Sequence, residues 1–151
     1  MATVSVFDVA KYILEKKGRM TAMKLQKLVY YSQAWSLVWD EKPLFREKIE
    51  AWANGPVVRA LYEYHRGAFQ VTRLRKGDTS KLNQEQQDTI DAVLRDYGEH
   101  TAQWLSDLSH IEDPWNDARK GLPDGAPCDN EITLGSMHEY YSCLPADYPL
   151  S

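Results

Sequence analysis

Three neighbouring side chains near the middle of the second half could support acid–base or metal chemistry. His110, Glu112 and Asp113 place an imidazole beside two carboxylates, a set that can tune a general base or hold a metal ion. A structural role competes with this one. Asp113 precedes Pro114 at a predicted helix start, and His110 falls at a helix end, where a cation is favoured. We favour the structural role and keep a hydrolase or metal enzyme around His110, Glu112 and Asp113 as an alternative.

A second set of reactive side chains lies near the end of the chain. His138-Glu139 begins like the helix motif of zinc proteases, but Ser142 stands where the second histidine would follow. His138 and Cys143 are off a common helix face, and no third group is marked to orient them. The chain also has no G-x-S-x-G elbow and no glycine-rich phosphate loop. We therefore expect no catalytic residues, no metal site and no cofactor, and we predict that the protein is not an enzyme.

Length, cysteine content and hydropathy give broad limits. A chain of 151 residues has the length of one domain. Cys128 and Cys143 are far apart and lack metal-ligand spacing, so we expect free thiols in a reducing cytoplasm. No secretion signal is recognisable, and no apolar run is long enough to cross a membrane. These features predict a cytoplasmic protein without a membrane partner.

The charges are distributed unevenly along the chain. Residues 1–81 contain 15 Lys and Arg against 8 Asp and Glu, whereas residues 82–151 contain 3 against 14. The acidic half suits a basic protein partner, because complementary fields speed association and select partners. Nucleic acid is a poor partner for the acidic half. The basic 66–81 segment, with Arg66, Arg73, Arg75, Lys76 and Lys81, leaves phosphate binding open.

Apolar periodicity predicts a mainly α, compact single-domain fold of about six helices. Helix caps are expected at Ser5, Thr21, Asn83, Thr101 and Asp113-Pro114, and a last helix at 134–144. The helix that ends near Trp39 is apolar on most sides, which is typical of a central helix. Residues 45–53 and 69–74 alternate in polarity and could pair as a short two-stranded β-ribbon. The loop 122–130 is expected at the surface.

The segment 50–58, EAWANGPVV, predicts a fixed corner between two packed elements. Gly55 can adopt backbone angles closed to other residues, and Pro56 suits the first position of a helix that begins there. We assign Trp52, Gly55, Pro56 and Pro114 to structure rather than to binding.

Four blocks of sequence resemble the Panacea domain of SocA-like antitoxins and GepA-type phage-associated proteins. They are MKLQKLVYYSQAW at 23–35, KPLF at 42–45, EAWANGPVV at 50–58 and, after Tyr97-Gly98, LSDLSHIEDPW at 105–115. Their order and spacing agree over residues 4–144, which sets the expected domain and leaves 145–151 as a flexible tail. Ser109 stands where many members have Thr, and the residues after Gly121 match the family poorly.

The resemblance implies an antitoxin that neutralises a cognate toxin by direct protein contact. Such proteins are typically encoded beside the toxin and are often carried by prophages or other mobile genetic elements. One branch of the family implies an alternative role as a proteolytic adaptor that delivers the toxin to a Clp-type protease. We expect the exposed members of one set of aromatic and histidine side chains to contact the partner: Tyr30, Tyr31, Trp39, His110 and Trp115.

Overall fold

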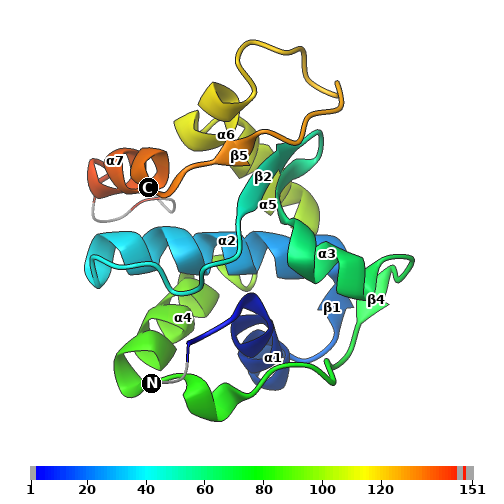
Figure 1. The fold of residues 1–151 in the computed structure, drawn as a ribbon, viewed down its shortest axis with the longest axis vertical. Helices are drawn as coiled ribbons and strands as arrows, with labels where there is room; N and C mark the ends of the chain where they lie inside the picture. The colour runs from blue at the N-terminus through cyan, green and yellow to red at the C-terminus, as the bar shows by residue number, and fades with distance from the viewer. Residues whose placement is uncertain (1–2, 146–147, 149–151) are drawn as a thin grey trace.

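The computed structural model describes residues 3–145 and residue 148, and these form a layered arrangement of short helices around one long helix (Figure 1). The described residues form seven α-helices, which confirms the mainly α fold class. The number of helices is one more than predicted. They are α1 (Val6–Lys17), α2 (Ala22–Trp39), α3 (Arg59–His65), α4 (Gln84–Tyr97), α5 (Ala102–His110), α6 (Asp113–Ala118) and α7 (Leu134–Ser142). A 3₁₀ helix, η1 (Thr79–Lys81), precedes α4.

The long helix α2 crosses the middle of the molecule and carries most of the core. It packs against α1 and α4 on one side and against α5 and α7 on the other (Figure 1). Its residues from Leu25 to Leu37 are all buried, so a helix that is apolar on most sides is central, as predicted.

Local cap interactions start the helices at the predicted positions. Asp8 accepts the Ser5 amide, and Asn83 and Gln86 exchange reciprocal hydrogen bonds between side chain and main chain. The hydroxyls of Thr21 and Thr101 accept main-chain amides one turn into α2 and α5. These four starts need only contacts within three residues.

The strands pair differently from the predicted ribbon. β2 (Ile49–Trp52) pairs antiparallel with β3 (Gly55–Val58) and, on its other edge, with β5 (Glu131–Ile132). β4 (Gln70–Val71) pairs with β1 (Met20–Thr21) instead of with residues 45–53. The predicted ribbon between 45–53 and 69–74 is therefore wrong, because each run finds its partner elsewhere in the chain.

Pro56 lies in a strand and not at the first turn of a helix, which corrects the sequence-based assignment. It stands opposite Ala51 in edge strand β3, and α3 begins only at Arg59. The Ala51 amide donates to the carbonyl of Asn130 on the far side of β2. The pairing of Ala51 with Pro56 therefore requires no N–H from the proline. An edge strand such as β3 tolerates proline for this reason.

Two buried glutamines of α2 hold extended chain against the helix. Gln26 accepts the Val58 amide through Oε1 at 2.9 Å and donates through Nε2 to the Val58 carbonyl at 3.3 Å. Gln33, two turns later, accepts the amides of Leu44 and Phe45 and donates to the Phe45 carbonyl. Each amide side chain thus replaces a missing neighbouring strand and satisfies buried main-chain groups.

Of the predicted tail 145–151, only Pro145 and Tyr148 lie among the described residues. The Tyr148 amide donates to the Pro145 carbonyl, and its hydroxyl donates to Glu112. The rest of the predicted tail lies outside the described residues.

Gly55→Val is expected to lower the free energy of unfolding by about 2–4 kcal/mol, because it adds strain and a clash at one site. Gly55 has φ +120°, and an added Cβ would lie 2.5 Å from Cε of the fully buried Lys27. Gly67→Val is the matched control, since Gly67 also has positive φ but open space around its Cα. Thermal and urea unfolding of both variants measure the difference. Equal losses in the two proteins would contradict the close packing of Gly55 against Lys27.

Candidate docking surfaces and the motif residues beneath them

Four side chains of α5, α6 and the residue after α6 bind the main-chain carbonyls of the β2–β3 turn. The carbonyls of Ala51, Ala53 and Asn54 lie outside the β2–β3 pairing, because Pro56 opposite Ala51 has no N–H and residues 53 and 54 form the turn. Each carbonyl lies at hydrogen-bond distance from one side chain, in inverse order along the chain: Ala51 O from Arg119 Nη1 (2.9 Å), Trp52 O from Trp115 Nε1 (2.9 Å), Ala53 O from His110 Nε2 (3.1 Å) and Asn54 O from Ser106 Oγ (2.8 Å). We call Ser106, His110, Trp115 and Arg119 the carbonyl clamp.

The clamp residues also pack on one another and on the following loop. The rings of His110 and Trp115 lie 4.0 Å apart, and the Arg119 guanidinium lies 4.7 Å from the Trp115 ring. Arg119 is 1% exposed and donates from Nη2 to the carbonyls of Pro123 and Ala126. The clamp therefore joins the β2–β3 turn to α6 and to the start of the predicted surface loop.

Glu112 lies at the centre of a buried group of tyrosines. Its Oε1 accepts the hydroxyls of Tyr31 and Tyr141, each at 2.7 Å, and its Oε2 accepts that of Tyr148. Since Tyr141 donates its proton to Glu112, the Tyr30 hydroxyl at 2.9 Å donates to Tyr141. Burial raises the pKa of Glu112 to about 6, against the opposing effect of these hydrogen bonds. Three elements, α2, α7 and the chain end, are thereby fastened to one carboxyl group.

Lys27 is buried without a partner. It is 0% exposed, and its Nζ forms no hydrogen bond among the described residues. Burial lowers its pKa to about 7, because the charged ammonium loses its hydration.

The proposed catalytic or metal set does not come together. Glu112 is enclosed by tyrosines, Asp113 lies on the exposed surface between α6 and α7, and both nitrogens of His110 face main-chain carbonyls. No group of three potential metal-ligating side chains occurs in the part of the chain that the structure describes. Cys128 and Cys143 are free thiols.

Three of the five predicted partner contacts are corrected, because they are core residues. Tyr30, Tyr31 and Trp115 are at most 1% exposed, so they cannot reach a partner in this structure. Trp39 is 47% exposed and His110 is half-buried. Trp39 ends α2, whereas His110 lies near its first turn beside Met23. At ~1.5 Å per residue, these two candidates are about 25 Å apart and belong to different surfaces.

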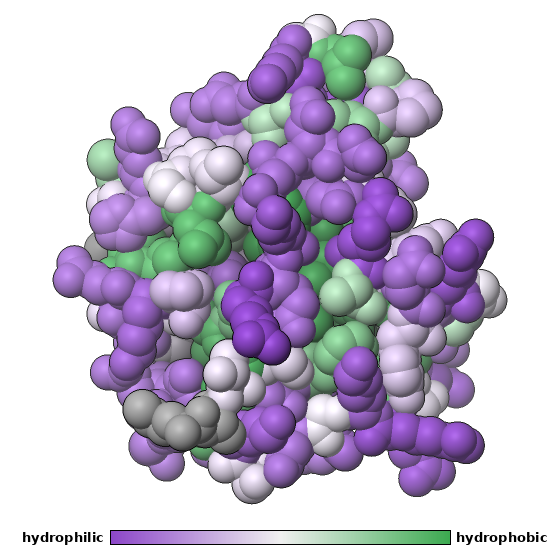
Figure 2. Space-filling model, viewed as in Figure 1, coloured by the Kyte–Doolittle hydropathy of each residue, from purple (hydrophilic) through white to green (hydrophobic). Residues whose placement is uncertain are grey.

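An acidic surface is formed where α6, β5 and α7 meet. Two adjoining hollows of about 400 and 320 Å³ share Asp117 and Ser136 in their lining. We call the carboxylates of these hollows the acidic face: Asp113, Asp117, Glu131 and Glu139. Lys120 is the basic side chain that lines the first hollow, Lys48 lies 3.9 Å from Glu131, and Arg119 is buried by the clamp. In the view of the whole molecule in Figure 2, hydrophilic residues cover most of the surface, and hydrophobic residues are visible in the centre.

A family model described as antitoxin SocA-like, Panacea domain, matches residues 25–116. The chain belongs to this family. The matched range contains α2 from Leu25 onward, the β2–β3 turn and three of the four clamp residues, Ser106, His110 and Trp115. A search of curated proteins and a search of solved structures each find no match. None of the helices within the described residues has the length and hydropathy needed to cross a bilayer.

Several residues that matter most were missed by sequence reasoning. Gln26, Lys27 and Gln33 interrupt an otherwise apolar helix, and Ser106 and Arg119 resemble surface residues in sequence. The two glutamines could have been recognised as buried, because they lie two turns apart on a helix that is otherwise apolar. Nothing in the sequence marks Arg119 as buried.

Lys27→Met is expected to stabilise the protein at pH 7 and to change how stability depends on pH. The unfolded lysine titrates near 10.5 and the folded one near 7, so the unfolded chain binds more protons between these values. The free energy of unfolding of the parent protein should therefore rise with pH across this window, by up to about 1.4 kcal/mol per unit. The methionine variant should lack this contribution.

Urea unfolding at pH 7.0, 8.0 and 9.0 measures the effect as the difference between the two proteins. Lys16→Met, which removes an exposed lysine from α1, is the control and should keep the parent's slope. Parallel curves for the parent and Lys27→Met would contradict an uncompensated buried amine.

Proposed function

We propose that this protein is a non-enzymatic antitoxin that neutralises a basic toxin by masking it with the acidic face. Family membership supports an antitoxin role, and the acidic face is the observation that carries the mode of binding. Its carboxylates line two adjoining hollows, so a basic partner can place side chains between charges instead of on a flat surface. Complementary charge of this kind raises the association rate and excludes acidic competitors.

Trp39 offers an exposed aromatic ring close to α7. Its ring stacks on that of Trp35, with 5.1 Å between the ring centroids. The ring centroids of Trp35 and of Tyr141 on α7 are 5.7 Å apart. An exposed aromatic ring held by a buried one is pre-ordered, which lowers the entropy lost on binding. Trp39 next to α7 therefore fits a rim or anchor position in the same interface.

The residues of the family blocks support the proposal because their polar atoms are already bonded within the fold. The clamp and the Glu112 group use their polar atoms to fix the fold. The chemistry left for a partner lies in surface charge and exposed rings, which is the expectation for a protein that acts by contact.

Replacing Asp117 and Glu139 together by Lys is expected to abolish neutralisation while leaving the melting temperature unchanged. Both carboxylates line the acidic face and are exposed, so their reversal acts on the partner's charges rather than on the core. The assay is co-expression with the protein encoded beside this one, scored by growth, followed by pull-down of the tagged pair. Affinity should fall by at least about tenfold, or ~1.4 kcal/mol.

The matched control is the double reversal Glu63→Lys with Asp88→Lys, two exposed carboxylates on α3 and α4. It should rescue growth like the parent. Undiminished rescue by the Asp117/Glu139 variant would contradict the acidic face as the binding site. Rescue accompanied by loss of the neighbour from the lysate would replace masking by delivery to a protease such as the Clp type.

A further inference from the structure

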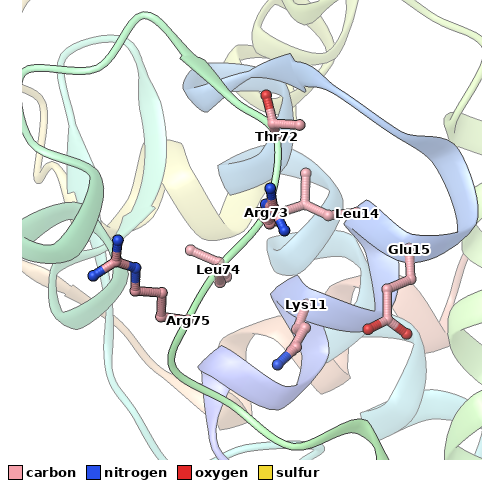
Figure 3. A pocket seen from close by; sticks show the side chains of 7 residues that line it. All are labelled: Lys11, Leu14, Glu15, Thr72, Arg73, Leu74 and Arg75. Carbon is pink, nitrogen blue, oxygen red and sulfur yellow. The ribbon is translucent and has the colours of Figure 1, made fainter.

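A second hollow lies at the opposite end of the molecule, between α1 and residues 72–75 (Figure 3). It has a volume of about 440 Å³. Leu14 and Leu74, both less than 5% exposed, lie at its base. Lys11 and Arg73 lie on its α1 side, while Arg75 points to the other side of the segment (Figure 3). We call this hollow the basic groove.

The segment beside the groove has unpaired main-chain groups. β4 pairs with β1 only through Gln70 and Val71, and the chain then runs on past α1 (Figure 3). Within the described residues, the amides and carbonyls of Thr72, Arg73 and Leu74 form no hydrogen bond. Pairing resumes at Arg75, whose amide donates to the Tyr64 hydroxyl at 3.1 Å. Open main-chain groups next to a strand are a template for an added strand.

The basic side chains around the groove outnumber the acidic one, and they form no ion pair within the described residues. Arg73 and Arg75 take part in no ion pair within the described part of the chain, and Lys11 donates only to the Gly77 carbonyl at 3.3 Å. Glu15, one turn after Lys11, is the carboxylate in the lining. A ligand with carboxylates near Arg73 therefore meets cations that have no internal partner.

We propose that the basic groove binds an extended acidic segment of a partner protein by strand addition. Main-chain groups of that segment pair with Thr72–Leu74, an aliphatic side chain enters above Leu14 and Leu74, and flanking carboxylates meet Arg73 and Lys11. Nucleic acid fits less well, because no aromatic side chain lines the groove to stack on a base. The site is independent of the acidic face, so an antitoxin could hold its toxin and a second protein at once.

The test uses a fluorescent heptapeptide, Asp-Glu-Leu-Asp-Val-Glu-Asp, with full-length protein labelled for amide NMR. Binding should shift the amide signals of Thr72, Arg73 and Leu74 and slow their hydrogen exchange. Arg73→Glu should weaken binding by at least about tenfold. Arg66→Glu, an exposed arginine on the same basic segment but outside the groove, should bind within about twofold of the parent.

Two further probes decide the mode of binding. A peptide with N-methylated leucine and valine keeps the charges but cannot donate main-chain hydrogen bonds from these two residues, which share one edge of a strand, and it should lose binding. Absence of shifts at Thr72–Leu74 with about 1 mM peptide would overturn the proposal. Equal binding by the N-methylated peptide, or tighter salt-dependent binding of duplex DNA at the same amides, would also overturn it.

Discussion

Four main-chain carbonyls in one turn need partners, and that requirement shapes the rest of this structure. The two-residue connection between β2 and β3 leaves the carbonyls of Ala51, Ala53 and Asn54 outside the strand pairing, and the Trp52 carbonyl lies where β3 begins. The carbonyl clamp places one side-chain polar atom against each carbonyl and so fixes α5 and α6 against the hairpin. Because a buried carbonyl without a donor costs about 1–3 kcal/mol, loss of the Arg119 donor to the buried Ala51 carbonyl should loosen several elements together.

Buried side-chain hydrogen bonds join several elements in the interior and specify how these elements pack. Gln26 and Gln33 hold extended chain on α2, and Glu112 gathers tyrosines from α2, α7 and the chain end. Lys27 departs from this pattern, since its amine has no partner among the described residues. Polar groups committed to the interior in this way leave recognition to the surface, where the acidic face and the basic groove lie at opposite ends.

What the sequence could predict depended on the range of the interactions. Helix starts such as Thr21 and Asn83 were predictable, because a cap bonds within three residues. The pairing of Ile49 with Ile132 was not, because it joins strands far apart in the chain and short runs carry no register signal. The same limit applied to the site. Tyr31 and Trp115 look like binding residues in sequence, and only their distant partners show that they belong to the core.

The account depends most on whether the clamp holds the hairpin, and native-state hydrogen exchange of Trp115→Phe tests this directly. The substitution keeps an aromatic ring and removes the indole donor to the Trp52 carbonyl. The account predicts that amides of β2, β3, α5 and α6 all exchange faster, by a common free energy of about 1–2 kcal/mol. Unchanged exchange in β2 and β3, with faster exchange confined to α6, would show that the hairpin is held without the clamp.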